Sequence, residues 1–162
     1  MKKLRLMVIL TLISFISACG FQLRGASSLP DTMTQLWLID DGLNADQIRL
    51  LSEMLVKAGA KLQLSDANDP VQLRVKIISL AERNLADSAG TGKTLVQISK
   101  QLSFSVKRPT DVSALQIKMI ERQMNIEQDS NNLLGTELEK VSAEKTLDQT
   151  LFSQLISQLK RL

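Results

Sequence analysis

Alternating hydrophobic and polar positions mark three consecutive strands in the middle of the chain. In Val71–Ile77 every second residue is apolar, which is typical of a strand with one packed and one wet face. Thr94–Lys107 repeats the pattern, although Lys100 interrupts the apolar face and suggests a bulge or a salt bridge at the sheet margin. In residues 115–126 the apolar phase shifts, which predicts a bulge or strong twist near the end of the strand. Together these segments predict an antiparallel meander.

A strand and a helix are expected before this meander. The compact apolar run Gln35–Asp41 ends in an Asp-Asp-Gly turn and predicts a buried strand. Asn44 and Gln47 then have the spacing of a capping box, so a helix is expected to begin there and to end at Gly59. The apolar face of this helix would consist of Ile48, Leu51, Leu55 and Ala58.

A longer helix is expected from Gly135 to the end of the chain. Thr136 and Glu139 have capping-box spacing, and apolar residues then recur every three or four positions over about seven turns. Its apolar stripe would consist of Leu138, Val141, Leu147, Leu151, Leu155, Leu159 and Leu162.

The expected order of elements is therefore strand, helix, three strands, helix. This order indicates an α+β fold with a four-stranded, mostly antiparallel sheet and two helices packed on one face. We expect a single domain over residues 35–162, preceded by an N-terminal tether over residues 19–34.

The segment Asp87–Leu95 reads DSAGTGKTL, and its second half resembles the end of a nucleotide-binding P-loop. Such a loop requires a glycine five positions before Gly92, but Asp87 stands there, and a strand rather than a helix follows. Gly90 and Gly92 are better explained as the tip of a hairpin. We therefore expect no nucleotide binding.

The N-terminus has the parts of a secretory signal peptide. Three basic residues precede the apolar run Leu6–Ile16, and the next residues are small. The sequence ISAC at 16–19 resembles the bacterial lipobox, whose cysteine receives a diacylglyceryl group before cleavage. Residues 1–18 are therefore predicted to be removed and Cys19 to be the lipid attachment site. An uncleaved membrane helix is the alternative, but its apolar core would be short.

Acylation at Cys19 would anchor the protein to a membrane without spanning it. Gly20 follows the cysteine, where lipoproteins retained in the inner membrane of enterobacteria carry aspartate. We therefore expect an outer-membrane location facing the periplasm. That compartment lacks an ATP pool, which is a second argument against nucleotide binding.

Charge and composition disfavour several classes of function. The chain has 20 basic and 17 acidic residues, and the excess of three lies in the predicted signal peptide, so no positive field remains to attract nucleic acid. Histidine is absent and the single cysteine is predicted to be acylated, which disfavours metal binding and most nucleophile–base pairs. We expect no catalytic residue, no metal and no cofactor besides the covalent lipid.

Three short motifs resemble the lipopolysaccharide-assembly lipoproteins, the LptE family. CGFQLRG at Cys19–Gly25 is similar to the opening of the family, and LPDTM at Leu29–Met33 is similar to the segment that leads into its first strand. NNLLGTELE at Asn131–Glu139 is similar to the segment before its last helix. The resemblance implies a non-enzymatic protein that plugs the LptD outer-membrane β-barrel, aids its assembly and helps deliver lipopolysaccharide to the outer leaflet.

Four further residues are candidates for contacts with these partners. Arg83 and Lys93, at the two ends of the expected hairpin segment, could bind lipopolysaccharide phosphates, or they could be solvated loop charges. Phe21 and Leu23 could dock the tether on the barrel wall or at the membrane interface, or they could form a short strand edge.

Two other functions stay open at this point. One is a different periplasm-facing envelope scaffold, such as an accessory of barrel insertion or a wall-binding module. The other is a small tethered hydrolase, which only the serines and carboxylates of the chain suggest.

Overall fold

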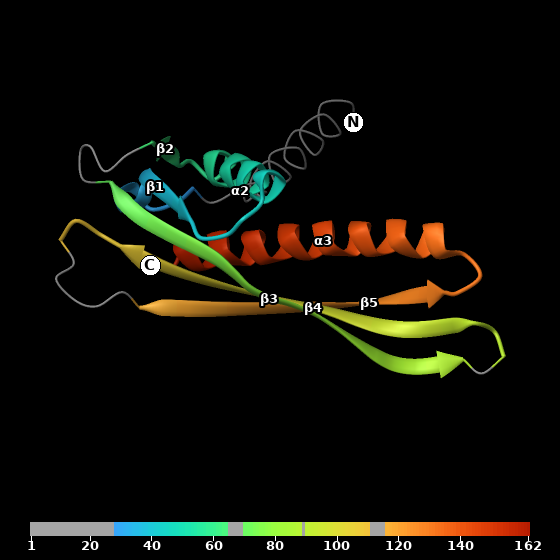
Figure 1. The fold of residues 1–162 in the computed structure, drawn as a ribbon. Coiled ribbons are helices and arrows are strands. Elements are labelled where there is room, and N and C mark those ends of the chain that lie inside the picture. Colours follow the sequence, from blue (N-terminus) through green and yellow to red (C-terminus); the bar gives the residue numbers. More distant parts are fainter. Residues whose placement is uncertain (1–27, 65–69, 89, 111–115) are drawn as a thin grey trace, which may run out of the picture.

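A computed structural model describes residues 28–64, 70–88, 90–110 and 116–162. Its strands form one mixed five-stranded sheet, and two helices lie side by side over one face of that sheet (Figure 1). The strands are β1 (Gln35–Asp40), β2 (Lys61–Gln63), β3 (Val71–Ser88), β4 (Lys93–Lys107) and β5 (Ile117–Asp129). The helices are α2 (Ala45–Lys57) and α3 (Leu133–Leu159), and a 3₁₀ turn, η1 (Asp31–Met33), precedes β1.

The sheet has five strands in the order β2-β1-β3-β4-β5, not the four that the sequence predicts. The additional strand is β2, whose three residues are too few to produce an alternating pattern. β1 pairs in parallel with both β2 and β3, because β1, α2 and β2 form a crossover unit that returns the chain to its starting direction. The three strands β3, β4 and β5 are antiparallel, as predicted.

The hairpin formed by β3 and β4 is longer than predicted. β3 continues through Arg83 to Ser88, so this segment is strand and not hairpin end. Gly90 and Gly92 have φ values of 82° and 70°, which confirms the predicted hairpin tip. Register shifts after Ile77 and after Asn84 interrupt the alternation along β3 and hide its second half from the sequence pattern.

Of the bulge or strong twist predicted in residues 115–126, the bulge is wrong, because β5 pairs with β4 in an unbroken register. The phase shift in the sequence has a different cause. Ile117 and Met119 are 70% and 65% exposed, whereas Ile120 and Ile126 face the helices and are buried. The first apolar residues of β5 therefore belong to the opposite face of the sheet.

The two helices begin at different kinds of cap. At α2 the predicted capping box is confirmed, since the side chain of Asn44 accepts from the Gln47 backbone and the reverse bond is also present. At α3 the predicted box of Thr136 and Glu139 is wrong. The cap is Asn132, whose side chain accepts a hydrogen bond from the next turn.

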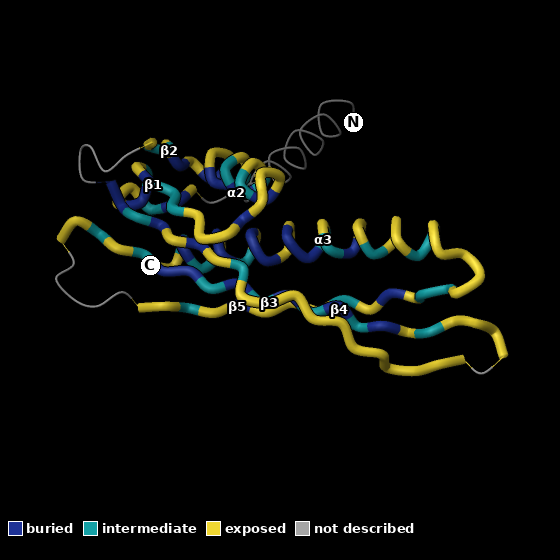
Figure 2. The backbone as a smooth tube through the Cα atoms, in the orientation of Figure 1, coloured by how far each residue is buried: buried dark blue, intermediate teal, exposed yellow. Residues whose placement is uncertain are grey.

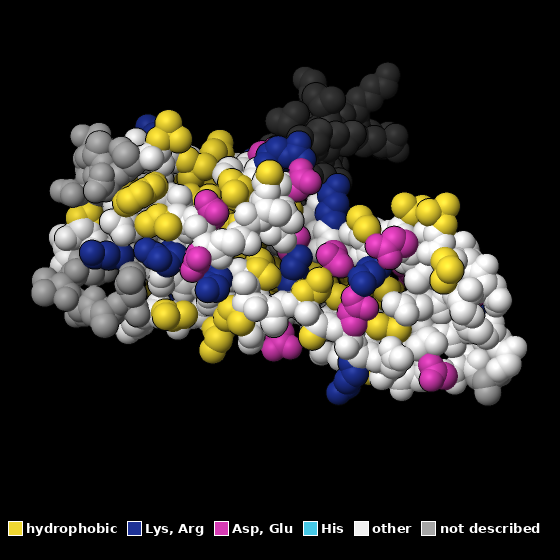
Figure 3. Space-filling view, viewed as in Figure 1, with side chains coloured by type: hydrophobic (Ala, Val, Ile, Leu, Met, Phe, Trp, Pro, Cys, Tyr) yellow, Lys and Arg dark blue, Asp and Glu magenta, His cyan; other side chains and the backbone are white. Residues whose placement is uncertain are grey.

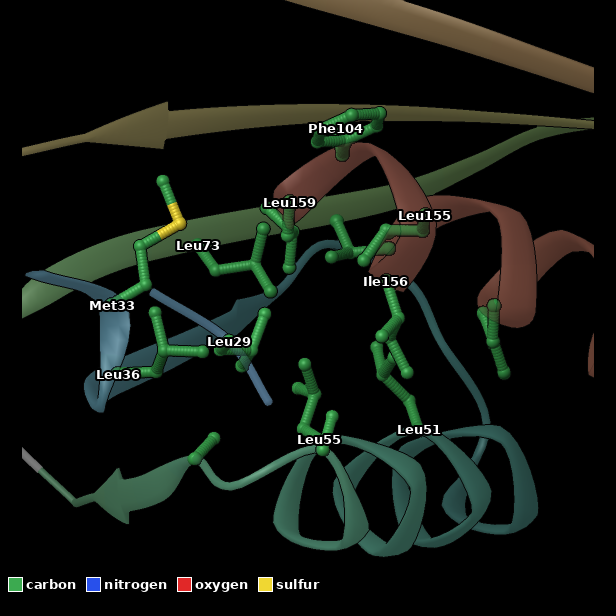
Figure 4. Close-up of a cluster of buried hydrophobic side chains, with 14 of the residues drawn as sticks. Leu29, Met33, Leu36, Leu51, Leu55, Leu73, Phe104, Leu155, Ile156 and Leu159 are labelled. Carbon is green, nitrogen blue, oxygen red and sulfur yellow. The ribbon is translucent and has the colours of Figure 1, made fainter. Parts of the chain in front are cut away.

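Two hydrophobic clusters join the helices to the sheet. The larger one combines α2, the second half of α3 and the parts of the strands beneath them (Figure 4). The smaller one, formed by Val96, Ile98, Ile126, Ala143 and Leu147, lies under the middle of α3. Beyond it, the end of the β3–β4 hairpin is largely exposed (Figure 2). The core thus occupies one face of the sheet.

The folded body begins before the predicted domain boundary at residue 35. Leu29 and Met33 are buried in the larger cluster, and the backbone N–H of Leu29 donates to the carbonyl of Ala58 at 2.8 Å. Residues 29–33 therefore pack as part of the domain and not as a free tether.

Candidate functional site

The end of the molecule that carries the β3–β4 turn, here called the distal end, is held together by contacts between two turns. The backbone N–H and the hydroxyl of Ser130 both donate to the carbonyl of Gly92, at 2.8 and 2.9 Å. A Cβ at Gly92 would lie 2.5 Å from the Ser130 Oγ and 2.8 Å from the Asn131 Nδ2. Because only glycine permits this approach, the hairpin turn and the turn between β5 and α3 form one unit.

Lys93, one of the two predicted phosphate-binding cations, lies at this distal end. Its ammonium group contacts the carboxylate of Glu127 on β5 at 2.5 Å. This hydrogen bond and the negative charge of Glu127, with a smaller contribution from Asp129, raise the pKa of Lys93 above its usual value of 10.5. Lys93 is therefore charged at neutral pH, but a phosphate that binds it must compete with Glu127.

Arg83, the second predicted cation, lies on β3 opposite Gln97 of β4. Gln97 is four residues from Lys93, so the two cations are separated by about 13 Å along the sheet. Arg83 makes no salt bridge with any other residue that the structure describes. The two cations therefore lie on neighbouring strands but too far apart to bind the same phosphate group. Each of them could contact a different anionic group.

The sheet face opposite the helices, here called the outer face, is polar in its central part, carries the exposed apolar residues Ile117 and Met119 at one end of β5, and is covered by no described helix. Its central part consists of Gln97, Ser99, Gln101 and Ser103 on β4, paired with Glu121, Gln123 and Asn125 on β5. Figure 3 views the molecule from the side, with the helices above the sheet, and shows Lys and Arg side chains interspersed with Asp and Glu side chains. This face suits contact with another polar surface.

The first two turns of α3 carry an exposed apolar stripe, defined by Leu133, Leu134, Leu138 and Val141. Their exposed fractions are 74%, 74%, 64% and 57%, because the start of α3 extends beyond the first turn of α2 (Figure 1). The prediction that Leu138 and Val141 face the core is therefore wrong. In the sequence, the adjacent leucines before Gly135 are the one sign of this surface. Exposed apolar side chains grouped in this way mark contact surfaces.

Lys100 forms a salt bridge, one of the two predicted explanations, but the pair is buried under α3 on an inner strand and does not lie at the sheet margin. Its ammonium group is 2.7 Å from Oδ1 of Asp148 on α3, and Nε2 of Gln47 on α2 donates to Oδ2 of the same carboxylate at 3.0 Å. All three residues are buried. Each charge has its partner within the fold, so this network indicates a structural role.

Two grooves lie between α2 and α3, which run in the same direction. One, of about 570 Å³, is lined mainly by polar and charged side chains of the first turns of α2 and the middle of α3. The other, here called the C-terminal groove, has a volume of about 350 Å³. It is lined by Met54, Lys57, Ala58, Ser153, Ile156, Ser157 and Lys160.

Other kinds of site find no support in the part of the chain that the structure describes. Within it, no group of three or more Asp, Glu, His or Cys residues could hold a metal ion. No described helix is long and apolar enough to cross a membrane. Cys19, Phe21 and Leu23 lie outside the described residues, so their roles stay predictions.

Comparison with known proteins identifies the fold. No family model matches the chain, and no curated protein matches its sequence. Among solved structures, a rare lipoprotein B from Shewanella oneidensis is 21% identical with a TM-score of 0.65, over 77% of this chain and 92% of the other. A minor lipoprotein from Acinetobacter baumannii is 15% identical with a TM-score of 0.63, over 82% and 94%. A lipoprotein B from Nitrosomonas europaea is 16% identical with a TM-score of 0.56, over 87% and 90%.

The class that these matches define is an α+β architecture found in bacterial lipoproteins. At this level of identity the shared property is the fold, and the matched region covers nearly all of each of the three solved chains.

Proposed function

We propose that the protein is an outer-membrane lipoprotein that occupies the lumen of an LptD-type β-barrel and helps deliver lipopolysaccharide to the outer leaflet. The observation that carries the proposal is the outer face, a polar sheet surface that no described helix covers. The lumen of a large outer-membrane barrel is polar and must be sealed. Most side chains in the centre of this face are serine, glutamine and asparagine, which can form hydrogen bonds with such a wall.

Two further observations support this proposal. The CGFQLRG motif resembles the LptE family, and the fold is shared with lipoproteins such as rare lipoprotein B of Shewanella oneidensis. Acylation of Cys19 would hold the domain near the inner surface of the membrane and raise its effective concentration at the assembling barrel.

The proposed role is physical and not catalytic. The protein would fill space inside the barrel and contact lipopolysaccharide through Arg83 and Lys93. Arg83 has no ion-pair partner among the described residues, and Lys93 would exchange Glu127 for a phosphate.

Purification of the acylated protein in mild detergent tests the partnership. We expect a large β-barrel to co-purify in equal amounts, and recovery of the monomer alone would contradict the proposal. Ser99→Glu combined with Ser103→Glu places two charges on the outer face and should reduce the yield of the barrel. Ser52→Glu combined with Val56→Glu places the same charges on α2 and serves as the matched control.

Depletion of the protein separates the proposal from the alternative envelope scaffolds. Selective loss of surface lipopolysaccharide supports a role in its export. A general loss of outer-membrane barrels would instead favour an accessory of barrel insertion.

A further inference from the structure

The end of the molecule opposite the distal end, here called the proximal end, brings together segments that are far apart in the sequence. α2, α3 and β4 end there, and β1, β3 and β5 begin there (Figure 1). Arg108, just after β4, donates a hydrogen bond of 2.8 Å to the backbone oxygen of Leu162, just after α3. The proximal end comprises the described residues 28–36, 56–64, 70–73, 105–110, 116–119 and 156–162.

Basic residues dominate the proximal end. These segments contain one acidic residue, Asp31, and seven basic ones, Lys57, Lys61, Lys107, Arg108, Lys118, Lys160 and Arg161. The basic excess holds, at seven to four, when the three aspartates of residues 65–69 and 111–115 are counted as well. Residues 82–88, 90–96 and 126–145 at the distal end contain seven acidic and four basic residues, which is the opposite balance.

The proximal cations are available to an external partner. Among the described residues, no salt bridge involves any of the six proximal cations other than Arg108. At the distal end, Lys93 and Lys140 are each paired with a glutamate. Lys57 and Lys160 could complement the partial negative charge at the C-terminal ends of the two helices, but this does not account for the lysines on β2, β4 and β5.

Exposed apolar side chains lie among these cations. Leu64, directly after β2, is fully exposed, and Ile117, at the start of β5, is 70% exposed. The C-terminal groove adds an apolar surface between α2 and α3, with Lys57 and Lys160 among its lining residues. Apolar residues set among lysines and arginines are typical of surfaces that lie on anionic membranes, where cations approach the phosphates and apolar side chains enter the interface.

The position where the chain enters the body favours a membrane over an acidic protein as the partner. Leu29 is buried, and its backbone N–H donates to the carbonyl of Ala58, the residue that follows α2. The first described residues thus lie at the proximal end. A membrane anchor upstream of them would hold this end, and not the distal end, closest to the lipid.

We propose that the proximal end lies on the anionic headgroups of a phospholipid membrane, with its lysines and arginines toward the phosphates. This contact points the distal end of the sheet and of α3 away from the membrane surface. It requires neither the barrel nor lipopolysaccharide, so it can hold or fail independently of the proposed function.

The acylated full-length protein in lipid nanodiscs tests this orientation. An environment-sensitive dye is attached at Ser157→Cys, beside the C-terminal groove, or in a second sample at Ser142→Cys, in the distal half of α3. The emission from position 157 should shift to the blue in discs that contain phosphatidylglycerol. The shift should be absent in discs of phosphatidylcholine alone and should disappear at high salt. Position 142 should show no shift.

Neutralised cations provide a second measurement. Lys57→Gln combined with Lys160→Gln should lower the ratio of docked to undocked protein about 25-fold, or about fivefold for each cation removed from the anionic surface. Arg49→Gln combined with Lys145→Gln removes two cations from the same two helices, at the other groove, and is the matched control. Circular dichroism checks that both variants keep their helices.

Several results would overturn the proposal. Equal losses in the two double variants would show that total charge, and not the proximal end, decides the contact. Equal shifts at positions 142 and 157 would show that the body has no preferred orientation. A shift of equal size on phosphatidylcholine, or one that appears only after lipopolysaccharide or an acidic protein is added, would assign the surface to a different partner.

Discussion

A single buried lysine, Lys100, connects β4 to α3 through Asp148, and Gln47 connects α2 to the same carboxylate. Lys100 and Asp148 are 4% and 7% exposed, so neither can be solvated by water to a useful extent. Their ion pair and the hydrogen bond from Gln47 replace that solvation. A buried pair adds little stability compared with well-packed apolar residues, but the loss of one member leaves an uncompensated charge.

Substitution of one or both partners should therefore give unequal effects. Lys100→Met should lower the free energy of unfolding by about 3–5 kcal/mol, because it leaves the Asp148 carboxylate buried alone. Lys100→Met combined with Asp148→Leu should be closer to the wild-type protein. Urea unfolding followed by circular dichroism measures both, with Lys93→Met at the exposed pair as a control of little effect. Equal losses in the single and double variants would contradict the structural role.

At the scale of elements, α3 shows that the sequence can predict a helix without predicting which of its residues are covered by other elements. The periodic leucines predict the helix correctly, and Leu147, Leu151, Leu155 and Leu159 are buried. The same periodicity continues into the apolar stripe at its start, where no described element covers it. Periodicity shows which residues share a face, but the length of α2 decides how much of that face is covered.

The strands, too, are predicted only where the sequence pattern is clear. β1, β4 and the first half of β3 have clear patterns and are predicted within a few residues. The bulges in β3 and the shortness of β2 remove the pattern, so the sequence gives no indication of the fifth strand or of the full hairpin. The parallel pairing of β1 with its neighbours could not be predicted either, because the sequence pattern does not reveal β2.

The contact between the two distal turns gives a test that separates backbone strain from crowding. Gly90 and Gly92 both have positive φ, but a Cβ at Gly90 would have no neighbour within 4 Å, whereas one at Gly92 would meet Ser130 and Asn131. Each change to alanine should cost about 1 kcal/mol because of its φ value. Gly92→Ala should cost more, since it also disturbs the bonds to Ser130. Thermal unfolding of both variants measures the difference, and equal losses would show that the two turns are not coupled.

At the scale of the whole molecule, the sequence identifies the type of candidate site but not its geometry. It selects two cations near a hairpin, and the structure places both on the meander. It does not show that Glu127 neutralises Lys93, because a pair separated by 34 residues depends on the register of two strands. It also does not show that the outer face stays uncovered, which follows from both helices packing on one side.

These positions predict that two substitutions that each remove a charge have opposite effects on the binding of purified lipopolysaccharide. Arg83→Gln should weaken binding about tenfold, because it removes a charged donor without a partner among the described residues. Glu127→Gln should strengthen binding, because it releases Lys93. Titration with fluorescently labelled lipopolysaccharide measures both. Arg49→Gln on α2 is the control, and identical affinities in all three variants would exclude Arg83 and Lys93 as phosphate ligands.

The position of β1 between β2 and β3 has a consequence for the order of folding. A chain that emerges N-terminus first presents β1 before either neighbour, and Leu36–Asp40 finds its partners on β3 only after Val71–Val75 has emerged. Parallel pairing across such a separation is slow compared with the closure of the β3–β4 hairpin. The nascent polypeptide thus carries an unpaired, aggregation-prone strand during its synthesis, and a holding chaperone should bind there until β1 is enclosed between β2 and β3.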